Sequence, residues 1–126
     1  MTGAEPYSAR VAALYRAAVG AGRPAGPGWV SGEAREPLSA THVRCHLRVD
    51  AGRVAEVRYE VRGCPHTLAA LSAAAQALIG RLPDELELDV QALAADLGVP
   101  REKLGRLFVI QDAIRNAALL LPGRHA

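Results

Sequence analysis

The chain has 126 residues, of which 50% are hydrophobic, 22% are charged and only 4% are aromatic, and its formal net charge is +2. This length fits a single domain over residues 1–126, and its 25 alanines predict a core of small and branched aliphatic side chains. Because 15 basic residues are spread among 13 acidic ones, composition indicates no nucleic-acid-binding surface. The sequence holds neither an apolar run near the ~20 residues of a membrane-spanning helix nor a secretion signal at its start, so we expect a cytoplasmic protein with no membrane association.

The first predicted element is a short amphipathic helix over residues 8–19, in which apolar residues at helical spacing follow Ser8, a typical N-cap residue. Residues 20–29 contain four glycines and two prolines, which predict a flexible connection. The segment 29–36 is a candidate strand, and Pro37 confines it to the edge of a sheet or ends it.

Alternating apolar and polar residues then predict two strands, 42–49 and 53–62, joined by a tight turn in an antiparallel hairpin. The alternation fails near Ala55, which a β-bulge or a later start of the strand would explain. After Gly63-Cys64-Pro65 the apolar period becomes helical and continues to Ile79.

Residues 82–88 predict a loop, and two further helices are expected over residues 89–97 and 101–121. Strands therefore precede most of the helices, which indicates an α+β fold rather than alternating βαβ units. We expect a small antiparallel sheet of about three strands packed against the C-terminal helices, with one N-terminal helix.

Cys64 is the first candidate functional residue, because it lies between a predicted strand and the start of a predicted helix. Unpaired N–H groups and the helix dipole favour an anion there, so a thiolate is stabilised, and Arg62 adds positive charge. The position alone leaves two interpretations open: a reactive thiol, or a small half-buried residue that fills a turn.

The second cysteine, Cys45, shares its strand face with Val43 and Leu47, so we expect a core role. His42 and His46 occupy the opposite face, about 13 Å apart along the strand, too far apart to share a metal ion. We expect both to be solvated, with one as a candidate for lining a site.

His66 lies two residues after Cys64 and is a candidate metal ligand or acceptor of the thiol proton. Either role requires the first helical turn to direct both side chains to the same side. The alternative is an exposed histidine in that turn.

Several features taken together match one known family. Along nearly its whole length the chain resembles the IscU and NifU N-terminal type of iron–sulfur cluster assembly scaffold. The resemblance implies a three-stranded antiparallel sheet packed with helices, a fold shared with SufE-type sulfur acceptors, and a cluster or metal ion held by three cysteines plus an aspartate or histidine. The matching features are Tyr7-Ser8 with Val11 and Tyr15, the glycine-rich segment, the hairpin, Arg58-Tyr59 before Gly63-Cys64-Pro65, the small-residue run 69–73 and Gln111-Asp112-Ala113-Ile114.

The chain departs from the family pattern at the implied ligand positions. The first family cysteine corresponds to Ser39, its associated aspartate to Thr41 and the second cysteine to Cys64. The third cysteine corresponds to Arg106, preceded by Gly105 in place of a histidine. The resemblance thus implies a cofactor site at Ser39, Thr41, Cys64, His66 and Arg106, with Cys64 and His66 as the candidate metal ligands.

One thiolate does not satisfy a [2Fe–2S] cluster, which needs four ligands. A positive charge at Arg106 opposes a metal cation and favours a thiolate or persulfide anion. Self-association to a homodimer is one way in which two Cys64 thiolates can meet.

The resemblance implies three alternative functions, none of them turnover of a small-molecule substrate by an enzyme. The first is a divergent scaffold that binds iron or an iron–sulfur cluster and retains Cys64 as its thiol. The second is a SufE-like sulfur acceptor, with no cofactor, that carries a persulfide on Cys64. The third is a non-catalytic binding paralogue. The expected partners are a cysteine desulfurase or other cluster-assembly proteins.

Overall fold

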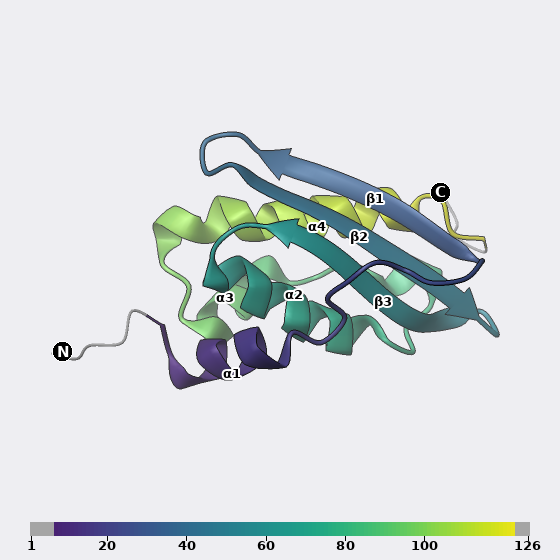
Figure 1. Ribbon diagram of the computed structural model, residues 1–126, viewed down its shortest axis with the longest axis horizontal. Coiled ribbons are helices and arrows are strands. Elements are labelled where there is room, and N and C mark those ends of the chain that lie inside the picture. Colours follow the sequence, from purple (N-terminus) through teal and green to yellow (C-terminus); the bar gives the residue numbers. More distant parts are fainter. Residues whose placement is uncertain (1–6, 123–126) are drawn as a thin grey trace, which may run out of the picture.

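Three strands form one antiparallel sheet in the order β1-β2-β3, and helices pack on one of its faces (Figure 1). The computed structural model describes residues 7–122. Of its helices, none is both long and apolar enough within residues 7–122 to cross a membrane. The elements are α1 (Ala9–Ala17), β1 (Trp29–Glu36), β2 (Thr41–Asp50), β3 (Arg53–Arg62), α2 (Pro65–Leu78), α3 (Val90–Leu97) and α4 (Leu104–Ala118), with 3-10 turns at Pro83–Glu85 and Arg101–Lys103.

This architecture confirms the α+β prediction, and local chemistry explains the element ends. The Ser8 hydroxyl accepts a hydrogen bond from the Val11 N–H at 3.1 Å and caps α1, which ends where Ala18 adopts a left-handed conformation. The predicted bulge is also confirmed, because the pairing of β2 with β3 passes from Glu56 to Val54 and skips Ala55.

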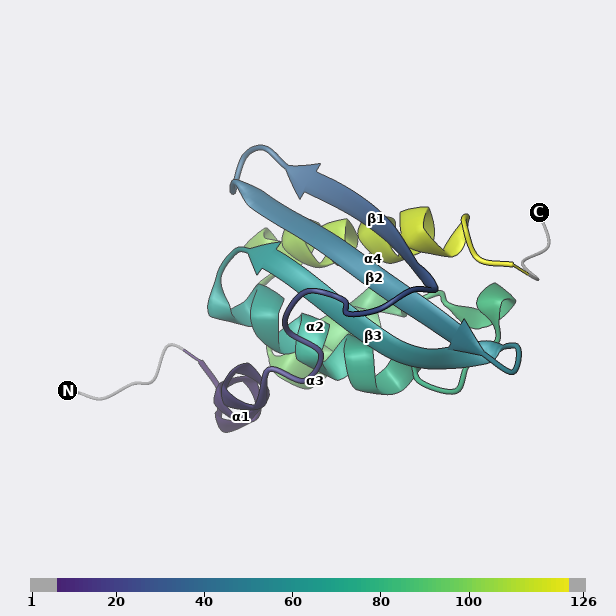
Figure 2. The same cartoon turned by 45° about the vertical axis from the view of Figure 1, so that its right-hand side comes forward.

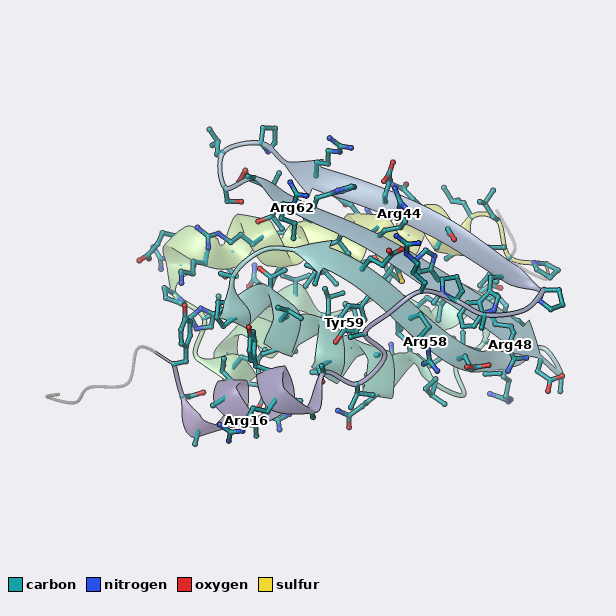
Figure 3. All side chains as sticks on the ribbon, viewed as in Figure 1. Arg16, Arg44, Arg48, Arg58, Tyr59 and Arg62 are labelled. Atoms are coloured by element: carbon teal, nitrogen blue, oxygen red, sulfur yellow. The ribbon has the colours of Figure 1, made fainter. Side chains whose placement is uncertain are left out.

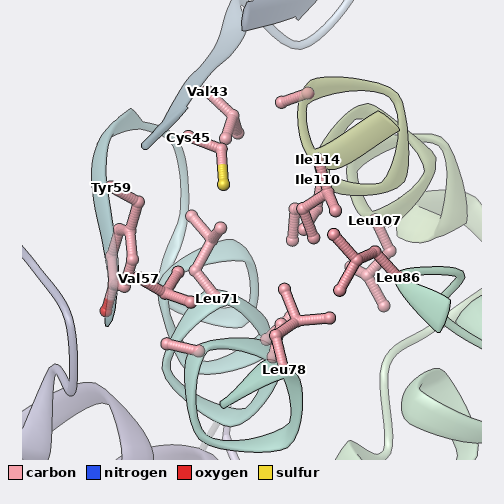
Figure 4. Close-up of a cluster of buried hydrophobic side chains, with 14 of the residues drawn as sticks. Val43, Cys45, Val57, Tyr59, Leu71, Leu78, Leu86, Leu107, Ile110 and Ile114 are labelled. Carbon is pink, nitrogen blue, oxygen red and sulfur yellow. The ribbon is translucent and has the colours of Figure 1, made fainter. Parts of the chain in front are cut away.

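The core lies between the sheet and the helices. Helix α4 packs on β1 and β2, α2 packs on β3, and α1 packs on α2. The buried side chains are mostly aliphatic, as the composition predicts, and Figure 4 shows the Cys45 sulfur pointing into this cluster. Cys45 is 1% exposed, so the core role predicted for it is confirmed.

Gly32 on β1 faces α4 where the strand and the helix backbone lie very close together. A Cβ atom at position 32 would lie 2.6 Å from the Ala113 carbonyl oxygen and closer still to the Ala117 nitrogen. Real Cβ atoms do not come this near to backbone, so only glycine lets α4 lie so close to the strand.

The opposite face of the sheet, called here the open face, carries most of the charged side chains of the strands. The chain between α1 and β1, residues 18–28, first pairs with the edge of β3 and then crosses this face to reach β1 (Figure 2). At that edge the Tyr59 N–H donates to the Gly20 carbonyl oxygen and the Gly22 N–H donates to the Tyr59 carbonyl oxygen, each at 2.9 Å.

The expectation that both histidines of β2 are solvated is wrong for His46, which is 4% exposed. Its Nδ1 lies 2.6 Å from the Ser31 hydroxyl and its Nε2 lies 3.0 Å from a Glu60 carboxylate oxygen. Because a carboxylate can only accept, Nε2 donates to Glu60. Sequence reasoning missed this burial because the two partners of the His46 ring lie on the other two strands, Ser31 on β1 and Glu60 on β3.

Gln111, part of the run that resembles the scaffold family, has a structural role. Its side chain accepts the Leu88 N–H at 2.8 Å and donates to Glu87 at 2.7 Å. These bonds attach the loop before α3 to the middle of α4.

Substitution of Gly32 with alanine is expected to lower the free energy of unfolding by about 3 kcal/mol or more, because the added methyl group must displace the α4 backbone. Urea denaturation measures this change. The control is Gly105→Ala, where the nearest atom to the added Cβ is a Glu36 oxygen at 3.9 Å. This control should be neutral or stabilising by up to ~1 kcal/mol. Equal tolerance of both substitutions would contradict the close approach.

Candidate functional site

Three parts of the chain that are distant in sequence meet at one end of the sheet, on the left in Figure 1. They are the β1–β2 turn with Ser39, the β3–α2 junction with Cys64, and the start of α4 with Lys103. The sequence-predicted site residues all belong to these segments, so the fold gathers them at the same end.

Cys64 is the N-cap residue of α2, and Pro65 follows it in the first helical turn. Its side chain is partly buried, and its sulfur lies 3.5 Å from the Thr67 hydroxyl. Thr67 itself is fully buried, one turn into the helix, so its hydroxyl is held in place.

Hydrogen bonds lower the pKa of Cys64 to about 7. Burial alone raises that pKa, but it is outweighed by the combined hydrogen bonds from the Thr67 hydroxyl and backbone N–H, from Arg106 and from the His66 backbone N–H. At neutral pH a larger share of Cys64 is therefore thiolate than of an ordinary cysteine.

Cys45 shows the opposite electrostatic environment. Burial among apolar side chains raises the pKa of its thiol to about 12. It stays protonated at neutral pH and is shielded from reagents, so chemistry at a thiol falls to Cys64.

His66 follows Cys64, but its ring is held by other groups. It is 3% exposed, and its Nδ1 accepts a hydrogen bond from the Lys103 ammonium at 3.3 Å. Its ring also meets the Tyr7 ring edge-on, at 4.7 Å between centroids. Burial and the charges of Lys103 and Arg106 lower its pKa, so the imidazole is neutral. The exposed histidine offered as the alternative is therefore wrong.

Ser39 and Thr41 bond to each other rather than to Cys64. Their hydroxyl oxygens are 2.7 Å apart, and the Ser39 N–H donates to a Glu36 carboxylate oxygen at 2.9 Å. Thr41 is 1% exposed. These contacts stabilise the β1–β2 turn beside the site.

The side chains that replace the family's ligands do not fit a cluster held by this chain alone. They comprise one thiol, two hydroxyls that bond each other, and a guanidinium, which has no lone pair to offer a metal. Residues 7–122 hold no group of three or more His, Cys, Asp or Glu placed to bind a metal ion. Anion stabilisation at Cys64 is what these residues can provide.

Sequence reasoning missed three residues of the site: Tyr7, Thr67 and Lys103. Thr67 carries a local signal, since the third residue after an N-cap faces the capping side chain. The roles of Tyr7 and Lys103 depend on contacts between distant segments and have no local signal.

Comparison with known families gives one match that spans almost the whole chain. The profile of the NifU-like N terminal domain family matches residues 7–126. No curated protein matches the chain.

Solved structures with the same fold include a candidate iron–sulfur cluster assembly scaffold for the SUF system from Fervidobacterium islandicum AW-1. It is 14% identical, with a TM-score of 0.68 over 89% of this chain and 96% of the other. The N-terminal part of a nitrogen-fixing NifU-like protein from Brucella abortus is 18% identical, with a TM-score of 0.59 over 90% and 95% of the two chains. At these identities the likeness establishes the fold, and it confirms the NifU-like architecture.

The low pKa of Cys64 predicts its reactivity with iodoacetamide. Alkylation of Cys64, followed by mass spectrometry of the peptides, should rise with pH around a midpoint of about 7. Arg106→Gln removes one hydrogen bond to the thiolate and should move the midpoint to higher pH. Arg101→Gln, in the neighbouring turn, should leave it unchanged.

Cys45 is the internal reference for that measurement. It should stay unmodified until the protein is unfolded, because it is 1% exposed and remains a thiol. A Cys64 midpoint near 8.5, the ordinary value for cysteine, would contradict the stabilised thiolate.

Proposed function

The chain belongs to the NifU-like N-terminal domain family of iron–sulfur cluster assembly scaffolds, and we propose that it is a divergent member that carries sulfur as a persulfide on Cys64. The observation that carries this proposal is the partly buried thiol at a helix N-terminus, with a pKa lowered to about 7 by Thr67 and Arg106. The donor is a protein persulfide of the kind that a cysteine desulfurase forms.

The transfer step balances without an added oxidant or metal. The Cys64 thiolate attacks the outer sulfur of the donor persulfide, and a new S–S bond forms at Cys64. The S–S bond of the donor breaks, and its electron pair stays with the donor cysteine as a thiolate. The hydrogen on the outer sulfur moves with it, so Cys64 becomes a persulfide, which ionises to an anion.

The surroundings of Cys64 suit each stage of this step. Donors at Thr67 and Arg106 stabilise the attacking thiolate, and the same donors are in place for the persulfide anion that replaces it. Lys103, one turn before Arg106 and bonded to His66, adds a further positive charge. The side chain is partly exposed, so a partner's persulfide has access.

In this role the chain holds and passes on sulfur, and it does not turn over a small molecule. Its proposed partners are a cysteine desulfurase and a later acceptor in cluster assembly. A cluster, where one is assembled, is cargo whose remaining ligands another protein or a second copy of the chain supplies.

Incubation with a cysteine desulfurase and cysteine should add one sulfur atom to Cys64, detected by mass spectrometry of the intact protein and its peptides. Cys64→Ser should abolish the addition, and Cys45→Ala should keep it. Arg106→Gln should slow it, because less thiolate is present at pH 7. If a known acceptor protein in the same assay gains sulfur and Cys64 does not, the proposal is wrong.

Anaerobic incubation with iron and sulfide separates this proposal from cluster binding by the chain alone. We expect no visible absorption band of an iron–sulfur cluster in wild type or in Cys64→Ser, since one thiolate leaves three ligand positions unfilled. A band that appears in wild type and is lost in Cys64→Ser would favour the scaffold alternative.

A third experiment concerns the binding paralogue. If the Cys64→Ala variant supports the function of the protein in a cell as well as wild type does, the binding paralogue is favoured.

A further inference from the structure

The open face of the sheet ends in a row of basic side chains beside the β1–β2 turn. The strand register aligns Arg35 with His42 and His42 with Arg62, so one residue from each strand forms the row. Alternation along the strands directs all three to the open face, and both arginines are exposed. The two arginines therefore lie on the outer strands of the sheet, on either side of His42.

The other arginines of this face are neutralised by carboxylates. Arg44 bonds Glu33 at 3.3 Å, and Arg48 bonds Glu56 at 2.7 Å. Arg58 also reaches Glu56, at 3.3 Å. Figure 3 shows these three along the face, with Arg62 at its left end.

Arg35 and Arg62 are different, because neither forms an ion pair with a carboxylate of residues 7–122. Both border the same cavity of about 390 Å³, whereas Arg44 and Arg58 each border a different cavity. The cavity is lined by Arg35, Glu36, Pro37, Ala40, Thr41, His42 and Arg62.

One carboxylate, that of Glu36, lines the cavity, and a second, that of Glu33, contacts His42 beside it. One Glu36 oxygen accepts the Ser39 N–H, and the other lies on the α4 side, 3.9 Å from where a Cβ of Gly105 would be. Glu33 bonds His42 Nε2 at 2.9 Å and also Arg44. Neither acid therefore neutralises Arg35 or Arg62.

From this arrangement we infer that the cavity between Arg35 and Arg62 is a binding site for a phosphate group. The two arginines flank His42 on either side, with backbones roughly 10 Å apart at a strand spacing of about 4.8 Å. Two guanidinium forks approaching from opposite sides can each bind a pair of oxygens of one tetrahedral phosphate. A carboxylate has a single pair of oxygens and satisfies only one fork. The site is separate from the sulfur chemistry proposed for Cys64.

The site is tested by titrating the protein with inorganic phosphate and with pyrophosphate at constant ionic strength. Binding is followed by thermal denaturation and by NMR of the arginine Nε–H groups. Wild type should gain thermal stability, and the Arg35 and Arg62 signals should shift while the Arg48 signal stays. Arg35→Gln and Arg62→Gln should each weaken binding roughly tenfold or more, since each loses charge-assisted hydrogen bonds.

The matched control is Arg48→Gln, which removes the same charge from the far end of the same face and should bind phosphate as wild type does. Acetate at equal ionic strength should bind more weakly than phosphate. A larger effect of pyrophosphate than of phosphate indicates a phosphate ester or diphosphate as the natural ligand, and equal effects indicate inorganic phosphate. The inference is wrong if wild type does not respond, if the Arg35 and Arg62 variants respond like wild type, or if acetate acts as strongly as both phosphates.

Discussion

Helix α4 lies so close to β1 at Gly32 that the strand and helix backbones are in contact, and no methyl group fits between them. This contact fixes how α4 lies along the sheet, and therefore where its first turn lies. The first turn comes next to the end of β1, where Gly105 faces Glu36, and it brings Lys103 and Arg106 to the start of α2. The charge around Cys64 thus depends on packing in the middle of the sheet.

The positive charge at this end of the molecule determines which chemistry the site favours. Arg106, which the family resemblance aligns with a thiolate ligand, lowers the pKa of Cys64. Lys103 donates to Nδ1 of His66, so the lone pair of that nitrogen is not free to bind a metal. Both positive charges disfavour a metal cation and favour an anionic sulfur, and the persulfide proposal rests on this.

The two cysteines show how strongly the environment controls a thiol. Cys45 is surrounded by apolar side chains, and burial raises its pKa to about 12. Cys64 is partly buried as well, yet donors at Thr67 and Arg106 outweigh that burial and lower its pKa to about 7. The difference lies in hydrogen bonds to the charged form rather than in exposure alone.

Local patterns in the sequence determined the three strands, the bulge at Ala55, the start of α2 at Cys64-Pro65 and the burial of Cys45, because alternation, turn residues and helix capping act over a few neighbouring residues. They also singled out Cys64, since the anion-favouring end of a helix is a local property. The burial of His46, the contact of Lys103 with His66 and the unpaired arginines of the open face were decided only by the tertiary structure. Each depends on which distant segments come into contact, and a partner from another strand or helix leaves no periodic trace in the sequence around the residue it binds.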